Sequence, residues 1–250
     1  MDGSDYYICF IDLMGQKNFF ERITSREVSP DVMKDVERVS DGLRVMVKYV
    51  KNRYHRFFST EDDVGIELFS DSLLLSMRFK DDAYSKLGAW LDVLVKLVYI
   101  ACKYKLPFRG ALTKGWAARS KSGTIYGVGV DEAVDLEQSR ADFFRIVFSN
   151  TLARELGEQH SFDEYLDMDQ DSAMVLNYAG PRLLRRVEFS RERSQLYGVG
   201  MWVKERFEYF CCSSDAEQRK HANAKLARRY KLWYDYLTLQ SMKMYIKDNV

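Results

Sequence analysis

The sequence lacks the features that mark extracellular, membrane or nucleic-acid-binding proteins. Only four of its 250 residues are cysteines, and their spacing suits neither a disulfide framework nor a zinc site: Cys9, Cys102, Cys211 and Cys212. The 38 Lys and Arg almost cancel the 37 Asp and Glu, which argues against a broad basic surface for nucleic acid. The longest apolar run, residues 89–102, is too short to span a bilayer and contains Asp92 and Lys96.

The first residues also carry no targeting signal. They include Asp2 and Asp5 and no basic segment, so we expect no signal peptide. The interpretation is a soluble, cytoplasmic protein with no membrane partner and no nucleic-acid partner.

The hydrophobic pattern predicts an α+β fold. Period-two or continuous apolar runs indicate six strands, at residues 6–13, 64–69, 72–79, 108–113, 123–126 and 145–149. Apolar residues at helical spacing indicate three helices, at residues 30–57, 82–105 and 129–141. The order β-α-β-β-α-β, with a further β-α-β behind it, is the ferredoxin-like arrangement, an antiparallel sheet with helices on one face.

The pattern changes after about residue 150. Residues 158–172 are acidic and loop-like, and residues 213–247 predict a long helix rich in aromatic and basic groups. The simplest division is therefore one domain at 1–155 and a C-terminal extension at 156–250. We expect the extension, including the aromatic stripe near Trp233, to pack on the first domain or at a dimer interface.

Two aspartates stand out in the first domain. Asp12 ends the first buried strand, and Asp71 lies at the tip of the hairpin between residues 64–69 and 72–79. In a ferredoxin-like fold this strand and this hairpin are neighbours, so the carboxylates can converge and would repel each other without a cation between them. The alternative is that each aspartate only stabilises a turn, where Asp is common.

Four motifs in the correct order resemble the class III nucleotide cyclases, over about residues 6–149. Residues 10–15 (FIDLMG) resemble the first metal motif, and residues 69–72 (FSDS) resemble the second, with Ser70 where many members have Gly. Residues 109–115 (RGALTKG) resemble the strand whose Arg contacts the polyphosphate, and residues 127–137 (GVGVDEAVDLE) resemble the helix that follows it.

This resemblance implies a set of roles for individual residues. Residues 1–155 would be the catalytic domain, with two Mn²⁺ or Mg²⁺ ions per active site and with Asp12, Ile11 and Asp71 as metal ligands. Asp12, Asp71 and Arg109 would be catalytic. The substrate-binding residues would be Leu13, Met14, Gly15, Glu67, Thr124 and Arg109. The family forms homodimers with active sites at the interface.

The sequence departs from the family in the helix at 129–141. Asp131 and Asp135 stand where the family has a catalytic Asn and Arg, and carboxylates cannot donate to the transition state. Either another cation substitutes, with Arg140, Arg119 and Lys114 as candidates, or this chain stabilises the transition state in a different way.

The substrate prediction depends on Glu67 and on the residues around the motifs. Glu67 and Thr124 replace the Lys and Asp that select adenine, and a carboxylate can accept an N–H from uracil, cytosine or guanine. Glu67 can equally be a solvated strand residue. The sequence around the motifs resembles the bacterial anti-phage Pycsar cyclases. This resemblance implies UTP or CTP as substrate and cyclic UMP or cyclic CMP as a second messenger for a separate effector. The alternatives are a guanylyl cyclase or a degenerate domain that only binds nucleotide or dimerises.

Overall fold

The computed structural model describes residues 3–13, 30–57, 64–69, 71–79, 83–121, 123–169, 171–186, 189, 192–212 and 222–249. The described residues of the first part form six strands and three α-helices, in the order β1 (Gly3–Leu13), α2 (Pro30–Phe57), β2 (Val64–Phe69), β3 (Ser72–Arg78), α3 (Ala83–Lys103), β4 (Phe108–Arg119), β5 (Ile125–Tyr126), α4 (Val128–Arg140) and β6 (Ile146–Phe148). The remainder contains α5 (Asn150–Gly157), η2 (His160–Tyr165), β7 (Leu166–Met168), β8 (Met174–Leu176), α6 (Pro181–Leu184), α7 (Glu192–Cys212) and α8 (Ala222–Asn249).

The strands form one sheet in the order β2-β3-β1-β4-β6-β8-β7, with β5 paired to β4. The first four strands are antiparallel, and their order confirms the predicted ferredoxin-like arrangement. Strand β6 runs parallel to β4, so the complete sheet is mixed and the fold is α+β.

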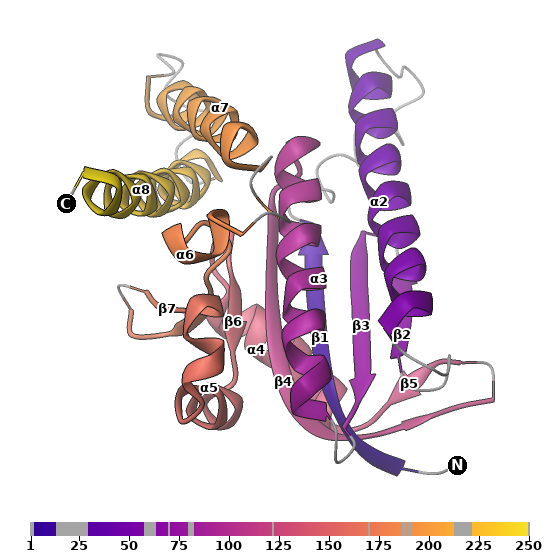
Figure 1. Cartoon of the computed structure of the whole chain (residues 1–250). Coiled ribbons are helices and arrows are strands. Elements are labelled where there is room, and N and C mark those ends of the chain that lie inside the picture. Colours follow the sequence, from indigo (N-terminus) through magenta and orange to yellow (C-terminus); the bar gives the residue numbers. More distant parts are fainter. Residues whose placement is uncertain are drawn as a thin grey trace.

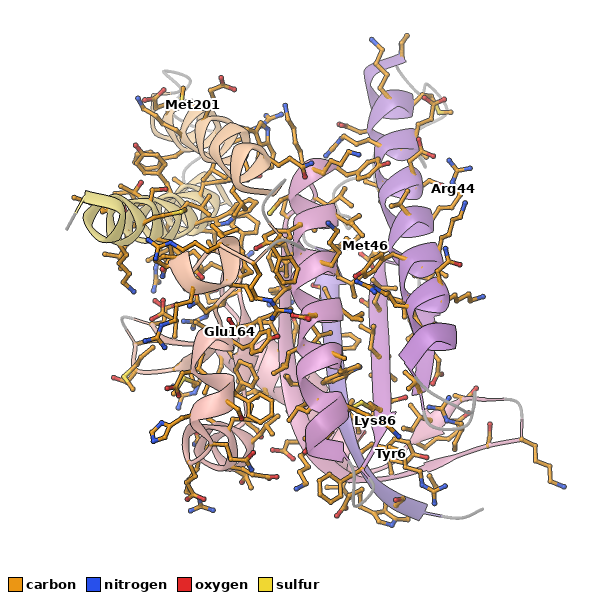
Figure 2. The ribbon with its side chains drawn as sticks, in the orientation of Figure 1. Tyr6, Arg44, Met46, Lys86, Glu164 and Met201 are labelled. Carbon is orange, nitrogen blue, oxygen red and sulfur yellow. The ribbon has the colours of Figure 1, made fainter. Side chains whose placement is uncertain are left out.

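Helices α2 and α3 cover one face of the sheet (Figure 1). Alternate residues of β1, from Tyr7 to Leu13, face these helices and join the main core. On α2 the buried Met46 lies on the side toward α3, whereas the exposed Arg44 points away from it (Figure 2). The amphipathic pattern of residues 30–57 therefore predicted both the helix and the face that it buries.

Helix α4 lies on the opposite face of the sheet, which the prediction of helices on one face did not include. Its buried residues recur every four positions, at Gly129, Ala133 and Glu137. A Cβ on Gly115 of β4 would lie 2.8 Å from the Cα of Gly129, so the helix and the strand meet backbone to backbone. This close approach, with a 3.0 Å hydrogen bond from Thr113 Oγ1 to the Gly129 carbonyl, sets the position of α4.

The C-terminal part adds to the same sheet and the same core. Strands β7 and β8 extend the sheet beyond β6, and Trp233 of α8 is fully buried among Phe108, Phe144 and Tyr178. This packing confirms that the aromatic stripe near Trp233 is core. The sheet and the core both continue past residue 155, and the division there stays a prediction.

The structure differs from the sequence prediction at several boundaries. Strand β4 runs to Arg119 and not to Thr113, because residues 108–118 pair with the whole of β1. The acidic stretch at 158–172 contains η2 and β7. The long C-terminal helix packs against a second helix, α7, which was not predicted because the apolar periodicity of α7 is weak. Among the described residues no helix is long and apolar enough to cross a bilayer.

Candidate active site

Three of the residues singled out from the sequence lie together at one end of the sheet. Asp12 is the penultimate residue of β1, and its cross-strand partners are Ser72 in β3 and Arg109 in β4. Asp71 immediately precedes Ser72, and its carbonyl accepts a 3.2 Å hydrogen bond from the N–H of Leu13. The hairpin between β2 and β3 thus brings Asp71 to the end of β1 where Asp12 lies.

The Asp12 carboxylate is held by both of its strand neighbours. Ser72 Oγ donates to Oδ1 at 3.2 Å, and Arg109 Nε donates to Oδ2 at 3.2 Å. Asp12 lies on the face of β1 that carries Tyr6 and Ile8, which is the face that α4 covers. The carboxylate and the guanidinium are both partly exposed, so a ligand can reach them.

The same guanidinium also contacts a second carboxylate, Glu137 of α4. Arg109 Nε forms an ion pair with Glu137 Oε1, and among the described residues that oxygen accepts no well-aligned hydrogen bond. No hydrogen bond joins the two terminal nitrogens of Arg109 to another described residue. Arg109 is therefore held by its Nε and presents its terminal N–H groups, which suit a phosphate.

Glu137 is a residue of the candidate site that its sequence pattern did not single out. The residue is 1% exposed, and burial raises its pKa to about 7, against the opposing charge of Arg109. The nearby Asp12 raises this pKa further, and Arg229 lowers it. A helical spacing of four with Gly129 and Ala133 was the signal that it faces the sheet.

Glu67 lies on the same face of the sheet, two strands away from Asp12, and contacts the residue that follows Thr124. Glu67 lies opposite Leu74, a residue of the α4 face, and its Oε1 accepts a 2.8 Å hydrogen bond from the N–H of Ile125. Burial raises the pKa of Glu67, while the Ile125 N–H and the charge of Arg119 act in the other direction. Glu67 is thus a fixed, half-buried carboxylate next to the Thr124 loop and not merely a solvated strand residue.

The side chains of the remaining predicted site residues either point away from Asp12 or lie outside the described residues. Leu13 and Ile11 point into the main core, away from Asp12, and Ile11 is flanked in the sheet by Leu73 and Gly110. Only their backbones can take part in the site. Met14 and Gly15 lie outside the described residues, as does Ser70.

The three candidate substitute cations differ in position. Lys114 lies on the opposite face of β4 from Arg109, where its Nζ pairs with Glu155 at 2.8 Å, so it cannot serve the site. Arg119 lies on the site face and donates to Ser76 Oγ at 2.8 Å. Arg140 is exposed at the end of α4.

Asp131 and Asp135 are also exposed on α4. Neither approaches Asp12 through any contact within the chain, since α4 presents Glu137 there. Any contact of Asp131 or Asp135 with a nucleotide would therefore be made at the exposed surface of α4.

The acidic segment 167–171 has a structural role. Asp169 and Asp171 bind Arg145, which is almost fully buried, at 2.7 and 2.6 Å. The loop-like stretch is therefore only partly solvated, because Asp169 is largely buried against this guanidinium, whereas Asp171 stays exposed while it pairs with it.

The donor set at Asp12 and Asp71 fits a hard divalent cation. The described residues contain no cluster of three or more His, Cys, Asp or Glu side chains that could enclose a metal ion. Mg²⁺ typically takes one or two carboxylates and completes its shell with water and substrate phosphates, so two carboxylates beside an arginine are sufficient.

Comparisons with known proteins give a distant likeness. No family model matches the chain, and no curated protein matches it. A bacterial light-regulated adenylyl cyclase aligns over 80% of this chain and 100% of its own, with 14% identity and a TM-score of 0.42. The guanylyl cyclase domain of RhoGC from Blastocladiella emersonii aligns over 70% and 95%, with 15% identity and a TM-score of 0.44. An adenylate cyclase from Trypanosoma brucei aligns over 70% and 90%, with 10% identity and a TM-score of 0.42.

The raised pKa of Glu137 predicts a pH dependence of stability. Between its ordinary pKa of 4.5 and about 7 the folded chain keeps a proton that the unfolded chain has lost. Raising the pH through this window therefore favours unfolding, and the effect levels off above about pH 7. We expect the free energy of unfolding of the wild type, relative to Glu137→Gln, to fall by about 1 to 3 kcal/mol from pH 5 to pH 8. Urea unfolding at several pH values checks this, and parallel curves would contradict it.

Proposed function

We propose that this chain is a metal-dependent nucleotide cyclase that converts UTP or CTP to the 3′,5′-cyclic monophosphate and pyrophosphate. The observation that carries the proposal is the convergence of Asp12, Asp71 and Arg109 at one end of the sheet. It pairs two potential cation ligands with a guanidinium whose terminal nitrogens point to no other described group. Such a set suits a triphosphate carrying divalent cations.

The second carboxylate site, at Glu67, supports a nucleotide in particular. It lies two strands and two residues from Asp12, which corresponds to about 12 Å at ordinary strand spacing. An extended nucleoside triphosphate spans a distance of this order, so its base could reach Glu67 while its phosphates contact Arg109. One Glu67 oxygen is taken by Ile125, and the other can accept an N–H from uracil or cytosine.

The chemistry assigned to the residues is mainly positioning. Asp12 and Asp71 would hold two Mn²⁺ or Mg²⁺ ions, which lower the pKa of the ribose 3′-hydroxyl and neutralise the triphosphate. Arg109 would bind the phosphates and stabilise the charge that develops on the leaving pyrophosphate. The 3′-oxygen attacks the α-phosphorus, the bond to the β-phosphate oxygen breaks, and the hydroxyl proton passes to solvent. By the motif resemblance, the product would be a second messenger in anti-phage defence.

One assay tests the substrate and the site together. The purified chain is incubated with Mn²⁺ and each of the four ribonucleoside triphosphates, and products are identified by mass spectrometry. We expect cyclic UMP or cyclic CMP from the wild type. We expect a loss of at least about 1000-fold in Asp12→Ala and Asp71→Ala, because each removes a charged ligand. The folded state of each variant is checked by circular dichroism.

The outcomes separate the alternatives. Cyclic GMP alone would contradict the pyrimidine substrate and favour a guanylyl cyclase. No cyclic product at any protein concentration would contradict an enzyme and favour a degenerate nucleotide-binding domain. Full activity in either aspartate variant would contradict the two-cation site.

A homodimer with shared active sites is part of the proposal. Three large apolar side chains near the start of α4 are exposed, Trp116 (52%), Tyr126 (58%) and Val128 (70%). Gly127 lies between the last two, and a Cβ there would be 3.1 Å from the Trp116 ring, so Trp116 lies beside this segment. A patch of this kind supports coverage by a second copy, which would also place the exposed acids of α4 at the interface.

Val128→Glu tests the dimer. Val128 is the first residue of α4, where a glutamate favours the helix, so the variant should fold. We expect it to be monomeric by light scattering and at least about 10-fold less active, since a buried charge opposes association. Met242→Glu, on the exposed side of α8, is the control and should stay dimeric. A dimeric Val128→Glu, or a fully active monomer, would contradict this arrangement.

A further inference from the structure

The C-terminal helix α8 places an arginine near the buried Glu137. Arg229 is only 12% exposed, and its Nη2 donates to Asp142 Oδ1 at 3.2 Å, just beyond the end of α4. Its charge acts on Glu137, and its buried Nε has no hydrogen-bond partner among the described residues. A cation from the far end of the sequence thus lies at the C-terminal end of α4, the helix that carries Glu137.

Aromatic packing holds Arg229 in this position. The next residue, Tyr230, packs on Phe144 with ring centroids 5.1 Å apart, and Trp233 packs on the same ring at 4.1 Å. Phe144 lies two residues beyond Asp142, so the segment that follows α4 is clamped against α8. The first half of α8 is therefore fixed relative to α4 and to Glu137.

A series of alternating charge runs from Arg229 to Glu137, Arg109 and Asp12. Ion pairs join its last three members, and the charge of Arg229 lowers the pKa of Glu137. Its members come from α8, α4, β4 and β1. The two carboxylates compete for the single Nε of Arg109. If Arg109 pairs with Asp12, it neutralises a carboxylate that the proposed cations need. If Arg109 pairs with Glu137, the Asp12 carboxylate remains available to the cations.

We propose that Glu137 and Arg229 are positioning residues that hold Arg109 by its Nε and aim its terminal nitrogens at the polyphosphate. This inference rests on the proposed function, in which Arg109 binds the phosphates. The charge of Arg229 lowers the pKa of Glu137 and so favours its ionised form, which can hold the guanidinium against the attraction of Asp12. Helix α8 thereby becomes part of the active site without touching the substrate, which assigns a role to the C-terminal extension.

The structure supplies a matched control on the same helix. Arg228 is the neighbour of Arg229 and carries the same charge, but it is exposed and has no ion pair or hydrogen bond within the described part of the chain. Arg228→Ala therefore changes the net charge as Arg229→Ala does and leaves Glu137 untouched. Arg229→Lys keeps the charge and tests for rescue.

The experiment measures binding of inorganic tripolyphosphate with Mg²⁺ to the full chain by calorimetry, together with the KM for the nucleotide. Tripolyphosphate carries no base, so its affinity reports on the phosphate site alone. We expect Arg229→Ala and Glu137→Gln each to weaken binding and raise KM by about 10-fold. We expect Arg228→Ala to change both by less than about twofold, and Arg229→Lys to recover most of the loss.

A double variant separates positioning from general damage. If Arg229 acts through Arg109, Arg109→Ala with Arg229→Ala should bind tripolyphosphate no more weakly than Arg109→Ala alone. Independent losses that multiply would overturn the inference. If Arg229→Ala does not fold, Arg229→Met takes its place, because it keeps the aliphatic stem.

The failures are distinguishable. A wild type that cyclises a nucleotide, with Arg229→Ala and Glu137→Gln equal to Arg228→Ala, overturns this inference and leaves the proposed function standing. A wild type that binds no tripolyphosphate also overturns it. A wild type that cyclises no nucleotide overturns the proposed function and removes the basis of this inference with it.

Discussion

The guanidinium of Arg109, shared between Asp12 and Glu137, is the interaction on which the rest of the site depends. A buried carboxylate such as Glu137 costs free energy unless a cation lies against it, and Arg109 supplies that cation. The pairing requires α4 to approach the sheet closely, which the absence of side chains at Gly115 and Gly129 permits. A small-residue contact at one end of α4 therefore determines which group holds the arginine at the other end.

The C-terminal part of the chain is joined to the first part by the sheet, the core and buried ion pairs. Strands β7 and β8 continue the sheet, and Trp233 lies in the main core. Arg145, which is buried, binds Asp169 and Asp171 across the same junction. Helix α8 is thus held in place by packing and by ion pairs, and Arg229 has a defined position relative to Glu137.

Much of the fold followed from periodicity in the sequence. The apolar stripe of α2 and the two short runs joined at Asp71 predicted a helix and a hairpin at the observed bounds, because each pattern has one dominant period. The end of β4 was not predicted, since Lys114, Gly115 and Trp116 resemble a loop and become strand only by pairing with β1. Helix α7 was missed for a similar reason, as its weakly amphipathic sequence is stabilised by packing against α8.

The site was predictable where it depended on strand ends and not where it depended on packing across the sheet. The adjacent ends of strands β1, β3 and β4 carry Asp12, Asp71 and Arg109, so the strand order alone brings these residues together. Strand parity could have excluded Lys114, which is five residues from Arg109 and so faces the other way. Glu137 was part of a motif but looked like one more surface acid on α4. Only the contact of α4 with the sheet shows that it is buried.

The most direct test of this account is a crystal structure of the chain with Mn²⁺ and 3′-deoxy-UTP, which cannot cyclise. The account predicts Mn²⁺ at the carboxylates of Asp12 and Asp71, with the terminal nitrogens of Arg109 on the phosphates and its Nε still on Glu137. A triphosphate bound away from Arg109, or an Arg109 that stays on Asp12 while Mn²⁺ binds elsewhere, would contradict it.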